Sequence, residues 1–320
     1  MLESRLGWDP TLDRYLYADN ELEANSILNE LRQQAENTIV TALQRERPTW
    51  SDSLKPIDLN LLAARFRTPD RRNEYLVWMS IDLNSLEDLN QGRDSTLLET
   101  GLAVYDSTWK ELSRRLETVP VSRSDTLHVF EDKYVVPYTV QSDQRKIYLS
   151  THVRSHDGRQ LGGYRFSLDE PPIDNRTFAL SDLVLGTYIE PTTRKTPFTY
   201  HNMLIKPNIA YRFKKSGLVY IYFELYNLTL QNGQTRYEIE QTVRPQASKN
   251  LLTNLKRLLG IGTKEIQITR NQVGASSLAS EYSAFDFSSL PAGKKVLVIR
   301  VKDLNSGQSA EKEVAFELVD

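Results

Sequence analysis

Hydrophobic positions along the chain follow two different periods. Between positions 20 and 44 the apolar residues recur every three or four positions, which predicts one amphipathic helix. After Pro56 apolar residues alternate with polar ones, which is typical of half-buried antiparallel strands. The change of period separates an N-terminal helical segment, residues 1–54, from a long β region.

The alternation also predicts which residues face a core. In residues 75–86 and again in residues 219–230, every second position is apolar over a long run. Successive strand residues point to opposite faces of a sheet, so each run has one core-facing side. The predicted core residues are Val77, Met79, Ile81, Ile221, Phe223 and Leu225.

The two β stretches resemble each other. Residues 75–86 match residues 219–230, and residues 146–168 match residues 294–318, in the same order and at near-equal spacing. The repeat predicts a mainly β chain of two tandem antiparallel β-sandwich domains of Ig-like type. We place the first sandwich at residues 55–190 and the second at residues 191–320.

Turn residues connect the predicted strands. Asn232-Gly233 lies between two alternating runs and predicts a hairpin that pairs them, because both central residues of such a turn need a positive φ. Asp157-Gly158 and the turn at residues 305–307 predict two further hairpins. Residues 108–118 fit either a helix or a strand, and we favour a long strand interrupted near Trp109.

The second β region carries an inserted segment. Residues 250–260 place five leucines on one helical face, with Lys256 and Arg257 beside them. A basic helix with one apolar face suits a membrane surface or a groove on a partner. The alternative is that the helix covers the open end of the sandwich.

Aromatic residues give the first candidate binding site. If Ile221 and Phe223 face the core, then Tyr220, Tyr222 and Tyr226 share the opposite face, and Trp78 holds the position equivalent to Tyr222. Tyrosine combines a flat apolar ring with a polar tip, which suits a protein interface or a sugar ring. The alternative is that these rings pack on the neighbouring domain or on the inserted helix.

Composition excludes several classes of function. Among 320 residues, Lys plus Arg number 40 and Asp plus Glu number 42, so no basic excess indicates nucleic-acid binding. The absence of Cys excludes thiol catalysis and cysteine-based metal sites. His152 and His156 have the spacing of zinc ligands on a helix but lie in a strand and its turn. We expect no catalytic residues, no metal and no cofactor.

Neither a transmembrane segment nor a signal peptide is visible in the sequence. The most apolar run, residues 218–225, is interrupted by Glu224, and Glu3 and Arg5 stand where a signal peptide needs an apolar core. A cytoplasmic protein follows if Met1 is the native start. A chain cut from a longer secreted protein of the bacterial periplasm or envelope would look the same.

Several phrases of the chain resemble a known family. They include LSDLVLG (180–186), KPN (206–208), the run at 219–243 and LPAGKKVLVIRVKDLNSGQ (290–308), with AARFRTPD (63–70) and GLAVYDSTW (101–109) before them. Together they resemble the C-terminal β region of bacterial GWxTD-domain proteins, although the Gly-Trp-x-Thr-Asp motif is absent. The resemblance implies a β fold and a cell-envelope location, and it transfers no active site.

These observations lead to two functional hypotheses. The first is a non-enzymatic binding or scaffolding module of a bacterial cell-envelope protein, with a protein or glycan partner. It assigns binding to Trp78, Tyr220, Tyr222 and Tyr226, and membrane-surface contact to the segment with Lys256 and Arg257. The alternative is a set of accessory β domains of a larger enzyme, such as a peptidase, whose catalytic part lies outside this chain.

Overall fold

The computed structural model describes residues 54–70, 72–246 and 266–320. In these residues the chain is mainly β, with four sheets and two very short helices. None of the helices in this part of the chain is long and apolar enough to cross a membrane. The helices predicted over residues 20–44 and 250–260 lie outside the described residues, so the assignment of those segments stays a prediction.

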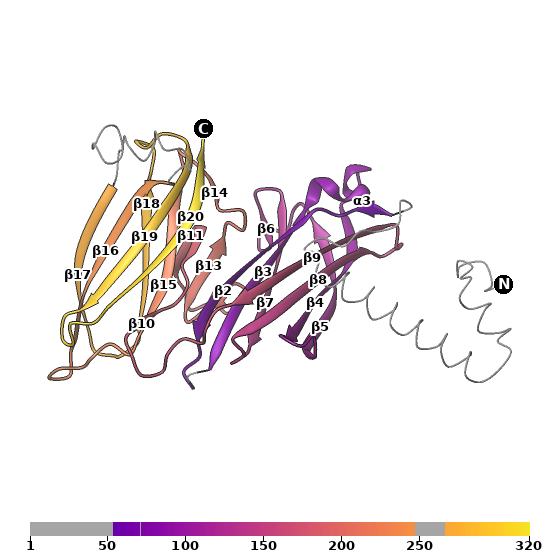
Figure 1. Ribbon diagram of the computed structural model, residues 1–320. Helices are drawn as coiled ribbons and strands as arrows, with labels where there is room; N and C mark the ends of the chain where they lie inside the picture. The colour runs from indigo at the N-terminus through magenta and orange to yellow at the C-terminus, as the bar shows by residue number, and fades with distance from the viewer. Residues whose placement is uncertain (1–53, 71, 247–265) are drawn as a thin grey trace, which may run out of the picture.

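Sheets A and B form the first sheet pair, at the indigo and magenta end of the molecule (Figure 1). Sheet A has the order β1 (Lys55–Pro56), β9 (Gln160–Asp169), β8 (Lys146–Ser155), β4 (Ser95–Asp106) and β5 (Glu111–Ser122). Sheet B has the order β2 (Leu59–Arg67), β3 (Asn73–Asp82), β7 (Lys133–Gln141) and β6 (Val129–Phe130). Two short helices, η1 (Leu83–Ser85) and α3 (Glu87–Asn90), lie between β3 and β4. The two sheets enclose one hydrophobic core, which holds Val77, Met79 and Ile81 as the alternation predicts.

Sheets C and D form the second sheet pair, at the orange and yellow end (Figure 1). Sheet C has the order β10 (Ala179–Leu180), β15 (Leu218–Tyr226), β11 (Val184–Pro191), β13 (Met203–Pro207) and β12 (Thr199–Tyr200), with β18 (Ala279–Asp286) also paired to β15. Sheet D has the order β14 (Arg212–Lys214), β20 (Ser309–Val319), β19 (Gly293–Asp303), β16 (Thr235–Pro245) and β17 (Ile266–Gly274). Their shared core holds Ile221, Phe223 and Leu225, again as predicted.

The two sheet pairs repeat one pairing scheme. In the first pair β3 pairs with β7, β4 with β5 and β8, and β8 with β9. In the second pair β15 pairs with β18, β16 with β17 and β19, and β19 with β20. A short parallel contact completes each scheme, β1 with β9 and β14 with β20. The sequence match between residues 75–86 and 219–230 therefore aligns β3 with β15, two strands in equivalent places.

The turn at Asn232-Gly233 corrects one prediction. Both residues adopt positive φ, 54° and 76°, and Gln231 bridges Gln234, so the tight turn forms as expected. The strands on its two sides do not pair, because β15 lies in sheet C and β16 in sheet D. Asn227, at φ 61°, and the buried Leu228 redirect the chain from one sheet to the other before the turn begins. The hairpins predicted at Asp157-Gly158 and at residues 305–307 do form, as β8–β9 and β19–β20.

A third hydrophobic cluster joins the two sheet pairs. Strands β2, β3 and β7 of sheet B and strands β11, β13 and β15 of sheet C contribute side chains to it, from the faces that point away from the two cores. Figure 1 shows these sheets side by side in the middle of the molecule. The buried members are Ala64, Phe66, Leu76, Trp78, Val135, Val184, Ile189, Phe198, Met203, Ile205 and Tyr222. We call this cluster the central layer.

Candidate binding site between the sheet pairs

The predicted aromatic face lies inside the molecule. Tyr222 and Tyr226 have no exposed surface, and Trp78 is 3% exposed. Trp78 and Tyr222 belong to the central layer, where the Tyr222 ring lies 5.7 Å from that of Phe66. The assignment of Trp78, Tyr222 and Tyr226 to a partner-binding surface is therefore wrong. The alternative stated for them, packing on the neighbouring β region, is what the structure shows.

The remaining predicted binding residues are Tyr220, Lys256 and Arg257. Tyr220 is only partly buried at the edge of the central layer, and its ring lies 5.8 Å from that of Tyr188, which is exposed. Tyr220 thus keeps part of its surface exposed, and its contact with a partner stays a prediction. Lys256 and Arg257 lie outside the described residues, so their predicted contact with a membrane surface or partner stays a prediction.

The buried tyrosines surround a buried acid, Glu224, whose side chain has no exposed surface. The Tyr222 hydroxyl donates a hydrogen bond to its Oε1, and the Tyr226 hydroxyl donates to its Oε2 at 2.7 Å. Ser181 fixes the same residue through its backbone, with Oγ accepting from the Glu224 N–H at 2.9 Å. These donors provide the partners that a buried carboxylate requires.

His201 supplies another donor to this acid. Its Nδ1 lies 2.7 Å from Oε1 of Glu224, and because a carboxylate only accepts, Nδ1 carries the proton in this contact. The hydrogen bond to Glu224 raises the pKa of His201, and its charge adds to the effect, although burial acts in the opposite direction. Burial beside this acid also raises the pKa of Tyr222 and of Tyr226, with burial the larger cause.

Arg67 connects this network to the first sheet pair. Its backbone N–H donates to the Tyr226 hydroxyl at 3.0 Å, and its guanidinium carbon lies 4.4 Å above the Tyr226 ring. Its Nη2 donates to Oδ1 of Asn227 at 3.1 Å. The last residue of β2 therefore contacts the last residue of β15 and its successor, which fixes the two sheet pairs relative to each other.

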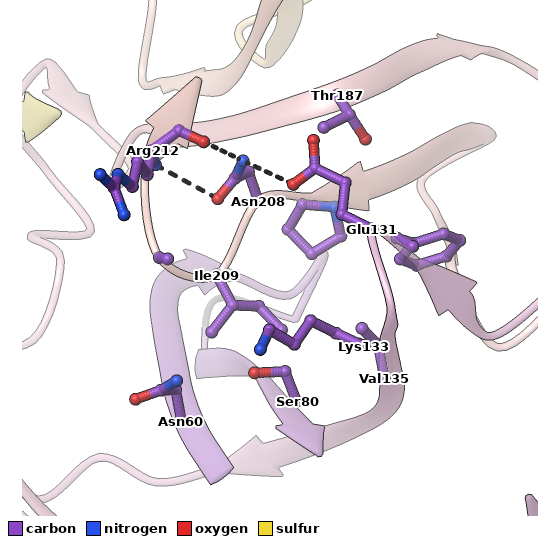
Figure 2. A pocket seen from close by; sticks show the side chains of 12 residues that line it. Asn60, Ser80, Glu131, Lys133, Val135, Thr187, Asn208, Ile209 and Arg212 are labelled. Carbon is purple, nitrogen blue, oxygen red and sulfur yellow. Dashed lines mark hydrogen bonds between the residues drawn. The ribbon is translucent and has the colours of Figure 1, made fainter. Parts of the chain in front are cut away.

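A pocket of about 310 Å³ lies where the central layer meets solvent. Figure 2 shows its two sides: Asn60, Ser80 and Lys133 come from sheet B, Asn208 follows β13, and Arg212 begins β14. The remaining lining residues are Phe130, Glu131, Val135, Thr187, Pro207, Ile209 and Ala210. Because both sheet pairs contribute, the pocket exists only while the central layer holds them together.

Some polar groups of the pocket lining are held by hydrogen bonds or ion pairs, and others are left to contact a ligand. Asn208, only 6% exposed, donates to the Arg212 carbonyl at 2.7 Å and accepts the Arg212 N–H, which closes the loop before β14. Lys133 pairs with Asp82, and the Arg212 guanidinium lies 3.4 Å from the Glu317 carboxylate. Figure 2 shows the Glu131 carboxylate directed towards Thr187 and Asn208. With both signs of charge present, this lining fits a polar ligand with both donors and acceptors.

Sequence reasoning gave no role to Glu131, Asn208 or His201. Asn208 belongs to the KPN phrase at 206–208, which entered only as a family resemblance. Glu131 and His201 adopt positive φ, 51° and 42°, a conformation that is uncommon for residues other than glycine. The sequence signal for these turns lies at the following positions, because Asp132 and Asn202, at φ 60° and 62°, are residue types that favour such a φ.

Comparisons with known proteins add little to this geometry. No protein-family model matches the chain, and no curated protein matches it. Among solved structures, the crystal structure of red sea bream transglutaminase is similar with a TM-score of 0.23 and 9% sequence identity. The likeness covers 95% of this chain but only 34% of that one, so the chain spans about a third of that protein's length. At this TM-score the likeness supports no statement about activity.

Proposed function

We propose that the chain is a non-enzymatic binding or scaffolding module of a bacterial cell-envelope protein, made of two tandem Ig-like β-sandwich domains. Each sheet pair corresponds to one such domain, except that β10 and β11, which the boundary at residue 190 assigns to the first domain, pair in sheet C of the second. The shared pairing scheme supports an origin of the two domains by duplication. The resemblance to GWxTD-domain proteins supports the envelope location. One observation carries the proposal: the two halves are joined by a buried layer that shapes a pocket from residues of both.

The pocket of Figure 2 is the binding site in this proposal. Ligand pockets are often found where two domains meet, with an apolar floor and a few polar groups that orient the ligand. Here Val135 and Ile209 supply apolar surface, and Asn60, Glu131 and Thr187 supply polar groups. A protein side chain or a sugar ring of a glycan can contact both the apolar surface and the polar groups.

A paired substitution tests this assignment. Asn60 is an exposed residue of β2 at the pocket, and Asn271 is an exposed residue of β17 that does not line it. Asn60→Arg narrows the pocket with a long cationic side chain, and Asn271→Arg makes the same change elsewhere. The immobilised chain and both variants are exposed to an envelope extract of the source organism and to a glycan array.

The expected result is a ligand retained by the unmodified chain and by Asn271→Arg and lost with Asn60→Arg. Equal retention by all three chains would contradict the pocket as the binding site. Cell fractionation with an antibody against the chain tests the envelope location separately. A signal confined to the cytosol would contradict that part of the proposal.

A further inference from the structure

A second pocket lies at the same junction, beside the buried Glu224. It encloses about 520 Å³ and is lined by the turn after β2, the turn between β12 and β13, and the connection between β17 and β18. Its charged lining residues are Arg67 and His201, and none of the described residues that line it is acidic. In this respect the second pocket differs from the pocket of Figure 2, which contains Glu131.

His201 is positioned by the buried network. Its Nδ1 is engaged by Glu224 at 2.7 Å, which leaves Nε2 as the ring nitrogen for a ligand. The side chain keeps 27% of its surface exposed, and the residue lines the pocket. Stacking on Tyr200, with ring centroids 4.1 Å apart, holds the plane of the imidazole.

Neighbouring donors face the same pocket. Asn202 follows His201 at φ 62°, and its Oδ1 accepts from the Lys195 ammonium at 3.2 Å, so its amide NH₂ is left to donate. Ser277 contributes a hydroxyl from the β17–β18 side, whereas the Ser280 hydroxyl donates to Oε1 of Glu224 at 3.4 Å. Glu224 lies behind His201, where it accepts from two tyrosine hydroxyls, and it is not among the residues that line the pocket.

We infer that this pocket binds a carboxylate-bearing ligand through His201 Nε2, the Asn202 amide and the Ser277 hydroxyl, with Arg67 as a supporting cation. Charge-assisted hydrogen bonds to a carboxylate are stronger than neutral ones, and the lining is rich in donors. Such a carboxylate occurs at the C-terminus of a peptide and in a sugar acid. The inference does not depend on the pocket of Figure 2, so either site can fail without the other.

Isothermal titration of the full chain at pH 6 tests the inference. The probes are N-acetyl-alanyl-alanine and glucuronic acid, each compared with its neutral counterpart, the dipeptide amide and glucose. At least one acid should bind at least about tenfold more tightly than its neutral counterpart. Binding of the dipeptide acid identifies a peptide terminus, and binding of glucuronic acid identifies a sugar acid.

Asn202→Asp is the decisive variant. Asn202 is exposed, Asp tolerates its positive φ, and the contact with Lys195 is kept, so the fold should be unaffected. The new negative charge should abolish binding of the acid. Asn271→Asp, an equal charge change on exposed β17, should leave the affinity unchanged.

The pH dependence provides a further readout. The charged groups around His201 are Glu224 on β15, Glu74 on β3 and Arg67 on β2. The acids raise the pKa of His201, so the affinity should fall as the pH rises through that pKa. The inference is overturned if neither acid binds, if acid and neutral probes bind equally, or if Asn202→Asp binds as the unmodified chain does.

Discussion

Nδ1 of His201 lies 2.7 Å from Oε1 of Glu224, whose side chain has no exposed surface. Two tyrosine hydroxyls donate to the same carboxylate, and one of them accepts the backbone N–H of Arg67 from the other sheet pair. A buried polar network in which each group has partners fixes one geometry, whereas a group left without a partner is costly. The stability of the junction should therefore depend on each member of this network.

Glu224→Gln should lower the free energy of unfolding by about 3 kcal/mol or more, because the amide cannot accept from all of the donors around it. Urea denaturation at pH 7 measures the change. Glu131→Gln, at an exposed position, should change it by less than about 0.5 kcal/mol. Equal midpoints for Glu224→Gln and the unmodified chain would show that the network contributes nothing.

The contact between His201 and Glu224 should make stability depend on pH. The pKa of His201 is raised above its unfolded value near 6.5, so its contribution is complete below pH 6.5. The contribution is lost as the pH rises through the folded-state pKa. Urea midpoints measured between pH 5 and 9 should therefore converge at high pH for the unmodified chain and His201→Asn. A constant difference over that range would contradict the assignment.

Trp78→Ala should cost about 3 to 5 kcal/mol, because it leaves a cavity in the central layer. Trp109 offers a matched control, since its half-buried ring stacks on Tyr148 at the surface. Trp109→Ala should cost only about 1 kcal/mol. Thermal unfolding of both variants distinguishes a buried layer from an open aromatic face, on which the two substitutions would have similar effects.

Gly186→Ala should destabilise the chain by about 1 to 3 kcal/mol, because an added Cβ would lie 2.6 Å from the Lys206 carbonyl oxygen. The irregularity in β11 after Gly186 depends on this close approach of two strands. In Gly217→Ala the added Cβ would meet the Lys214 carbonyl at an ordinary 3.5 Å. That variant should unfold at the same urea concentration as the unmodified chain.

Strand alternation predicted the two cores but not what covers the opposite faces. Val77 and Ile221 face their cores as the period of two requires. The same period places Tyr222 on the other face without showing whether water or protein lies there. Its neighbour in the central layer, Phe66, is 156 positions earlier in the chain, and local pattern carries no information about that contact.

The residue types at turns predicted the local backbone conformation but not which strands pair. Asn232-Gly233 predicted the positive φ values correctly, because they depend only on local sterics. Whether the flanking strands pair depends on where each finds its sheet partners. Glu131 and Asn208, which line the pocket of Figure 2, come together only when the two sheet pairs are packed.

The crossing from β15 to β16 bears on how the chain folds. Because these consecutive strands do not pair, β15 must find β11 and β18, and β16 must find β17 and β19, across long stretches of sequence. Non-local pairing slows the search for the native topology, so the second sheet pair should be a slow folder. During that interval β15 is an unpaired apolar strand, which makes early chaperone capture of this segment an expected step in its biogenesis.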